Sequence, residues 1–234
     1  RGKVMPLGCP IRPELVAATR AEGGKKLGID PSRKSLIVTG ASLGAKTIND
    51  ALLELLQDPK VRAAFDATNS NLRTQNSELP TWQIIHLSGI DQAAAVRDAY
   101  AKFPTLNVKV IDYCDDMASL WALADLAIAR AGASTCAELA ACGVPSLLLP
   151  YPYHKDMHQR ANAEELQKAG AALIIDDAKD AKMNAAAIKK PLESLLYDET
   201  KRATMAAKAR AAGKPAAAES IAHEILGLIA SSSR

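Results

Sequence analysis

The sequence has few aromatic residues and few cysteines. Its 234 residues include two Trp, five Tyr, two Phe and four Cys. Cys9, Cys114, Cys136 and Cys142 share no C-x-x-C spacing, so a zinc ribbon and a disulfide framework are both disfavoured. We therefore expect reduced thiols, as in a cytosolic protein. The apolar runs, of which 146–150 is among the longest, are far too short to span a bilayer.

The net charge is small, whereas alanine is abundant. A formal charge of +3 does not indicate a nucleic-acid partner. The 45 alanines predict closely packed helices, and an apolar content of 48% is typical of a globular chain. The length fits one large domain or two small ones. Because residue 1 is Arg and not Met, we expect the chain to be part of a longer protein.

Short apolar runs alternate with helical stretches along most of the chain. The runs are 35–39, 82–87, 108–111, 126–129, 146–149 and 172–175. Helical stretches such as 45–57, 92–102, 133–142 and 158–168 follow most of them. This alternation predicts an α/β fold with a doubly wound, parallel six-stranded sheet and helices on both faces. Residues 58–80 predict a long surface excursion with one helical turn at 62–65. Extra C-terminal helices are expected near 184–197, 199–212 and 215–230.

The loop after the first run could bind phosphate. Ligands of open α/β sheets bind beyond the carboxyl ends of the strands. Gly40 and Gly44 flank a loop there that opens a helix. Small residues let the backbone approach a phosphate, which the free N–H groups of a helix N-terminus can bind. A tight strand-to-helix turn without a ligand fits the same residues.

A P-loop is a less favoured interpretation of this segment. Lys46 and Thr47 stand where the motif has its Lys and Ser or Thr, but Ala45 replaces the glycine before them. That glycine normally gives the backbone the freedom to wrap the phosphates. The apolar run before Asp176 does resemble a Walker B strand.

The loop after the fourth run carries a candidate nucleotide site. Gly132 permits close approach of a ligand, and Ser134 and Thr135 place hydroxyls and N–H donors at a helix N-terminus. Glu138 follows them at helical spacing and so lies on the same face. A carboxylate there suits the paired hydroxyls of a ribose, as in dinucleotide sites. A helix cap with a first-turn Glu that favours the dipole fits the residues equally well.

Other loops give weaker signals. His154 and His158, four residues apart, could bind a metal with Asp156, but a helix start capped by Asp156 is the favoured interpretation. After the third run, Asp115 or Asp116 fits a helix N-cap. Neither a nucleophile elbow nor a Ser–His–Asp order stands out, so the sequence identifies no general base.

Five segments, in consistent order along the chain, resemble the MurG family of peptidoglycan glycosyltransferases. They are GCPIR at 8–12, GASLGA at 40–45, YCDDM at 113–117, RAGAST with Glu138 at 130–138, and HKDMHQ with Asn162 at 154–162. The family has two domains of GT-B type, and the chain is similar to its Rossmann-like, C-terminal half. The resemblance implies an interdomain hinge at 1–15 and a UDP-sugar donor-binding domain at 16–230, with the acceptor-binding N-terminal domain absent.

The resemblance also implies roles in binding UDP-N-acetylglucosamine. The backbone of Cys114 would pair with the uracil edge, and Glu138 would bind the ribose hydroxyls. His158 and Gln159 would face the hydroxyls of the sugar. The diphosphate would be bound from three segments, by Arg12, by Ser42 in the loop between Gly40 and Gly44, and by Ser134 and Thr135 next to Gly132.

Four positions depart from the family pattern. Ala41 replaces a glycine of the loop, Cys9 an Asn, Ser134 a Leu and His158 a Gln. The departure at His158 leaves the sugar selectivity open.

The activity implied for the whole enzyme is inverting transfer of N-acetylglucosamine to lipid I, which forms lipid II. The resemblance implies no cofactor, no metal and no nucleic acid. The general base is expected in the absent domain, which would contact the lipid acceptor peripherally at the cytoplasmic, inner face of the bacterial cell membrane. The chain alone is expected to bind the donor weakly or not at all in dilute solution, and not to transfer sugar.

Three alternatives to this function stay open at the level of the sequence. The first is another UDP-sugar transferase or an epimerase of GT-B architecture. The second is a nucleotide-binding module without catalysis, and the third is the P-loop-like NTPase.

Overall fold

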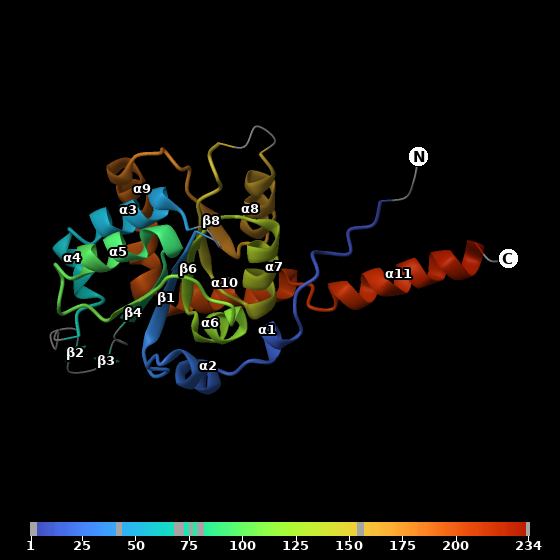
Figure 1. Cartoon of the computed structure of the whole chain (residues 1–234), viewed down its shortest axis with the longest axis horizontal. Coiled ribbons are helices and arrows are strands. Elements are labelled where there is room, and N and C mark those ends of the chain that lie inside the picture. Colours follow the sequence, from blue (N-terminus) through green and yellow to red (C-terminus); the bar gives the residue numbers. More distant parts are fainter. Residues whose placement is uncertain are drawn as a thin grey trace.

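A parallel sheet forms the centre of the computed structural model, which describes residues 4–40, 44–67, 73–74, 77–78, 82–153 and 157–232. Within these residues the sheet has six strands (Figure 1). Their spatial order is β5 (Val108–Ile111), β4 (Trp82–Leu87), β1 (Lys34–Thr39), β6 (Leu126–Ala129), β7 (Ser146–Leu148) and β8 (Ala172–Ile174). All neighbouring pairs in it are parallel. The predicted doubly wound parallel sheet is thereby confirmed, and the strand order reverses between β1 and β6.

Both faces of the central strands are buried, so the sheet separates two apolar cores. Along β1, Leu36 and Val38 face one core and Ile37 faces the other. Strands buried on both faces have near-continuous apolar sequences, which is why the six runs predicted them. The first core is covered by α3 (Lys46–Leu55), α5 (Ala93–Tyr100) and α9 (Ala181–Tyr197). The second is covered by α1 (Glu14–Ala17), α6 (Met117–Leu123), α7 (Ala133–Cys142) and α8 (His158–Lys168).

Aspartate side chains cap several helices at their N-termini. The caps are Asp58 on α4 (Pro59–Ala63), Asp116 on α6, Asp180 on α9 and Asp198 on α10 (Glu199–Ala212). Asp116 accepts the N–H of Ser119 at 2.9 Å, which confirms the predicted cap at this position. Among the described residues, no side-chain cap is present at the start of α1, α3, α5, α7 or α8. Their first-turn N–H groups therefore remain to be satisfied by something else.

Three helices follow the last strand, as predicted. They are α9, α10 and α11 (Ala217–Ser232). Figure 1 shows α11 extending away from the sheet, and it exposes Ile225, Leu226, Leu228 and Ile229. In the part of the chain that the structure describes, no helix combines the length and the apolar character needed to cross a membrane.

The prediction of a surface excursion is wrong for residues 59–65, although the helical turn expected at 62–65 overlaps the end of α4. They form α4 and the turn after it, and Val61 and Phe65 lie in the first core with no exposed surface. Val61, Ala64 and Phe65 have the i, i+3, i+4 spacing of a helix with one apolar face, which accounts for their burial. Farther on, β2 (Arg73–Thr74) pairs antiparallel with β3 (Ser77–Glu78) outside the main sheet.

Candidate functional site

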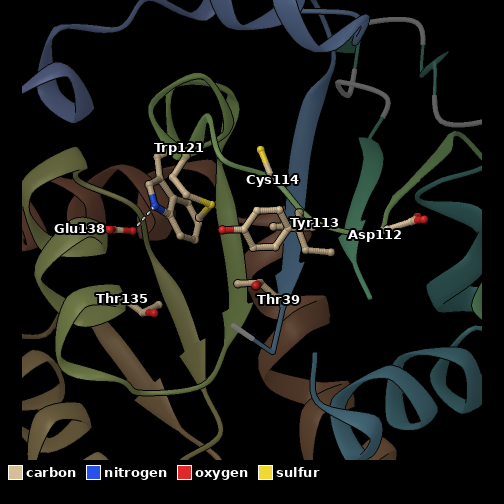
Figure 2. A pocket seen from close by; sticks show the side chains of 9 residues that line it. Thr39, Asp112, Tyr113, Cys114, Trp121, Thr135 and Glu138 are labelled. Carbon is tan, nitrogen blue, oxygen red and sulfur yellow. Dashed lines mark hydrogen bonds between the residues drawn. The ribbon is translucent and has the colours of Figure 1, made fainter. Parts of the chain in front are cut away.

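A cavity of about 190 Å³ opens at the carboxyl edge of the sheet (Figure 2). The carboxyl edge is where open α/β sheets bind their ligands. The lining residues come from the ends of β1 and β4, from the loop between β5 and α6, and from α6 and α7. They are Thr39, Leu87, Asp112, Tyr113, Cys114, Met117, Trp121, Thr135 and Glu138. Three predicted site residues, Cys114, Thr135 and Glu138, therefore meet at one cavity.

The first turn of α7 offers unpaired backbone donors beside this cavity. The N–H groups of Ala133, Ser134 and Thr135 have no acceptor among the residues that the structure describes. Gly132 has a φ of −62°, which any residue can adopt. A Cβ at Gly132 would meet only Thr135 Oγ1, at 3.8 Å. Neither the backbone conformation nor packing within the described chain requires this glycine, whereas close approach of an anion would.

Two side chains of α8 hold the peptide that precedes this turn. Gln159 Oε1 accepts the N–H of Ala131 at 3.2 Å and that of Tyr151 at 2.9 Å. Asn162 Nδ2 donates to the carbonyl of Ala131 at 3.0 Å. The oxygen of Gln159 is thus used within the protein, and its Nε2 amide is the group that can meet a ligand. His158 is the first residue of α8, and neither it nor Gln159 lines the cavity.

Glu138 presents its carboxylate on the wall of the cavity, held by a buried indole. Trp121 Nε1 donates to Glu138 Oε2 at 2.7 Å, and Trp121 is only 2% exposed (Figure 2). Thr135 lies one turn earlier on α7, on the same side. Trp121 was not predicted from the sequence, because an aromatic residue in an apolar helix is typical of an ordinary core position.

The loop between β5 and α6 presents its main chain at Cys114. Within the described ranges, neither the N–H nor the carbonyl of Cys114 takes part in a backbone hydrogen bond. Burial raises the pKa of its thiol, which favours the neutral form. The guanidinium of Arg12 donates to the carbonyl of Asp115 at 3.4 Å, although the two are 103 residues apart. A hydrogen bond with Asp115 raises the pKa of Tyr113.

Arg12 therefore lies beside the segment around Cys114, which is predicted to contact the uracil base. It does not line the cavity. Its predicted contact with a diphosphate stays a prediction.

The glycine loop is described only at its ends, and Ser42 lies outside the described residues. Gly44 has a φ of +74°, and a Cβ there would approach the carbonyl oxygen of Ser88 to 2.1 Å. Only glycine fits this position. Gly40 is equally confined, because its Cβ would stand 2.0 Å from the nitrogen of Ala45. Both glycines are thus required by contacts with described residues of the protein, in contrast to Gly132.

The side chains that would serve a P-loop have other partners. Lys46 pairs with Asp50 on its own helix, and the Thr47 hydroxyl donates to Asp177 at 2.6 Å. The carboxylate of Asp176 pairs with Arg160. In a P-loop, the Lys and Thr would instead meet phosphate and Mg²⁺. These pairings disfavour the NTPase interpretation.

A buried ion pair joins two loops at the carboxyl edge of the sheet, and the sequence alone did not predict it. Arg130 Nη1 lies 2.8 Å from Asp177 Oδ2, and the two side chains are 6% and 0% exposed. Arg130 also donates to Thr47 Oγ1 at 2.7 Å and to the carbonyl of Leu149 at 3.0 Å. The pair joins segments after β6 and β8 to the start of α3.

The Asp177 carboxyl is held in its charged form. Burial raises its pKa, but hydrogen bonds from Thr47, from Asn184, from the N–H of Lys179 and from Arg130 outweigh burial. The pKa of Asp177 therefore lies below its ordinary value of 3.8. Since all of these partners are internal, the cluster is a structural brace of the site.

No metal site emerges from the described ranges. Within them, no three His, Cys, Asp or Glu side chains come close enough together to hold an ion. His154 and Asp156, the candidate ligands named with His158, lie outside the described residues.

The chain matches known proteins over most of its length. A family model described as the glycosyltransferase family 28 C-terminal domain matches residues 35–221. The chain belongs to this family. A UDP-N-acetylglucosamine--N-acetylmuramyl-(pentapeptide) pyrophosphoryl-undecaprenol N-acetylglucosamine transferase of Halothermothrix orenii is 35% identical over 220 residues, which cover 92% of this chain and 54% of that relative.

Solved structures agree with this assignment of the family 28 domain. MurG of Acinetobacter baumannii is 28% identical, superposes with a TM-score of 0.67, and is matched over 92% of this chain and 55% of its own. A UDP-GlcNAc 2-epimerase of Neisseria meningitidis, 15% identical with a TM-score of 0.57 and matched over 89% of this chain and 48% of its own, shares the fold alone. The family 28 domain thus has the Rossmann-like fold of GT-B type that the sequence predicted. It spans about half the length of the relatives it matches.

Proposed function

We propose that this chain is the donor-binding half of a glycosyltransferase that moves N-acetylglucosamine from UDP-N-acetylglucosamine to lipid I in peptidoglycan synthesis. The observation that carries the proposal is the meeting of Glu138, the open first turn of α7 and the main chain of Cys114 at one cavity. Membership of family 28 and relatives named for this reaction support it. The epimerase alternative shares only the fold, so it gains no support from the family.

The cavity supplies complementary groups for each part of a uridine diphosphate. The amide and carbonyl of Cys114 match the donor and acceptor edge of uracil. The carboxylate of Glu138 can accept both hydroxyls of a ribose. The N–H groups at the start of α7, with the partial positive charge of the helix, suit the diphosphate. The sugar would then extend toward α8, where Gln159 offers its amide and His158 its imidazole.

The implied reaction is an inverting displacement. An acceptor hydroxyl attacks the anomeric carbon, the bond to the diphosphate oxygen breaks, and a general base takes the hydroxyl proton. Negative charge grows on the leaving UDP, and the fixed N–H groups of α7 stabilise it without reorganising. We place Arg12 and Ser42 at the same diphosphate. The base, the lipid acceptor and a peripheral contact with the inner membrane face belong to the half of the protein that this chain does not span.

Ligand selectivity tests the proposal directly. The chain is titrated to millimolar concentrations with UDP, UDP-N-acetylglucosamine, UDP-glucose and ATP, and weak binding is detected by saturation-transfer NMR. We expect the uridine nucleotides to bind and ATP not to compete. Tighter binding of ATP, or equal affinity for uridine and adenosine nucleotides, would overturn the proposal.

Glu138→Ala tests the site itself. Loss of the ribose contacts should weaken UDP binding by about 1–3 kcal/mol. Glu165→Ala is the matched control, because this glutamate is 77% exposed on α8 and pairs only with Lys168 of the same helix among the described residues. Equal affinity of the Glu138→Ala variant and the control would remove Glu138 from the site.

A further inference from the structure

The indole of Trp121 touches the candidate ribose ligand from inside the protein. Trp121 lies in α6 and Glu138 in α7, and the Nε1 to Oε2 distance is 2.7 Å. The ring is 2% exposed and also forms part of the cavity wall. The same residue thus contacts the cavity and orients a carboxylate on it (Figure 2).

This bond restricts what the carboxylate can do. An indole N–H is a donor only, so Glu138 Oε2 must accept from it. A glutamate side chain otherwise loses considerable rotamer freedom when it is fixed by a ligand. With Oε2 anchored to a buried ring, the rotamer freedom of Glu138 is already restricted before the ligand arrives, and the two lone pairs of Oε1 remain to accept the ribose hydroxyls. Pre-orientation of this kind strengthens binding because less ordering remains to be done.

The indole also connects two parts of the site. Helix α6 begins at Asp116, directly after the loop that carries Cys114, and Met117 and Trp121 line the cavity one helical turn apart. The short helix α6 therefore carries both Met117, which lines the cavity next to the predicted uracil position, and Trp121, which anchors the predicted ribose ligand Glu138.

We propose that Trp121 is a positioning residue, whose indole N–H holds the carboxylate of Glu138 in the orientation that reads the ribose hydroxyls. The inference rests on the proposed binding of UDP. It adds that the distinction between a ribonucleotide and a deoxyribonucleotide depends on a residue that forms no bond with the ribose.

Trp121→Phe removes the N–H and keeps an aromatic ring in the wall. Affinities for UDP and for 2′-deoxy-UDP are compared in the unmodified chain and in the variant. In the unmodified chain we expect UDP to bind about tenfold more tightly, the effect of one hydrogen bond to a charged acceptor. In the variant the preference should fall to about twofold or less. Trp82→Phe is the control, since Trp82 is equally buried but donates to the carbonyl of Leu196.

The outcomes separate the inference from the proposed function. If UDP does not bind the unmodified chain, both are overturned. If UDP binds and the Trp121→Phe variant loses affinity for both nucleotides by the same factor, Trp121 is only structural and the inference fails alone. The inference is supported if the preference for UDP over 2′-deoxy-UDP falls in the Trp121→Phe variant and is unchanged in the Trp82→Phe variant.

A second measurement needs no variant at Trp121. The chain has two tryptophans, so its indole N–H groups give two NMR signals, which Trp82→Phe assigns. The Trp121 signal should shift in the Glu138→Ala variant, and it should shift on addition of UDP more than on addition of 2′-deoxy-UDP. A signal indifferent to both changes would contradict the inference.

Discussion

His86 should make the stability of this protein depend on pH in a specific way. The side chain lies in β4 with no exposed surface, and burial lowers its pKa to about 3 from the ordinary 6.5. Asn49 Nδ2 donates to the carbonyl of Ser88 and to Gln92, so Asn49 Oδ1 is left to accept from His86 Nε2–H. His86 Nδ1 then accepts the hydroxyl of Tyr100 at 2.9 Å. Both ring nitrogens are thereby satisfied only in the neutral form.

The magnitude follows from linkage. Because the folded-state pKa of His86 lies below the unfolded-state value, the unfolded chain takes up the proton first. The contribution to stability is therefore complete above pH 6.5 and is lost as the pH falls from there toward 3. Between pH 7 and pH 5, this one residue should cost about 2 kcal/mol of unfolding free energy.

Urea unfolding at the two pH values measures the effect, with far-UV circular dichroism as the probe and with the denaturant slope checked for constancy. His86→Gln keeps a donor and an acceptor but does not titrate. We expect this variant to be less stable at pH 7, yet to lose about 2 kcal/mol less than the unmodified chain on going to pH 5. His223→Gln, on the exposed part of α11, should behave like the unmodified chain. A parallel loss in the unmodified and His86→Gln proteins would refute the reasoning.

Three further predictions have definite expected outcomes. Asp177→Ala strands a buried arginine and should lower the unfolding free energy by about 3 kcal/mol in urea titrations; a loss below about 1 kcal/mol would show that the ion pair is dispensable. Gly44→Ala should destabilise the chain by more than about 1 kcal/mol, whereas Gly132→Ala should leave the melting temperature nearly unchanged and weaken UDP binding; the reverse pattern would exclude Gly132 from the site. Burial raises the pKa of Cys136 to about 12, so mass spectrometry should find it unalkylated at pH 8 until urea unfolds the chain, and prompt labelling would contradict this.

The sheet could be predicted from the sequence because its central strands are buried on both faces. Each such strand leaves an apolar run, and the runs of β1, β4 and β6 were recognised for that reason. Within 58–80 the sequence indicates only one helical turn, at 62–65, because the polar residues after it obscure the helical spacing of the buried Val61 and Phe65.

Residue spacing predicted the candidate site only where its residues follow one another along the chain, and Cys114 was predicted from the family resemblance instead. Gly132, Thr135 and Glu138 belong to one strand-to-helix turn, so spacing alone places them on one face. Trp121 and Glu138 lie on different helices, and Arg130 and Asp177 follow different strands. The spacing of residues along the chain does not predict such pairs, because only the folded sheet brings them together.

The hydrogen bonds from α8 to Ala131 limit how the sugar preference proposed for this domain can change during evolution. Gln159 and Asn162 together hold the peptide that precedes the turn of α7 proposed to bind the diphosphate. A substitution at Gln159 that suited a different hexose would also release that turn, so affinity for every nucleotide sugar would fall at once.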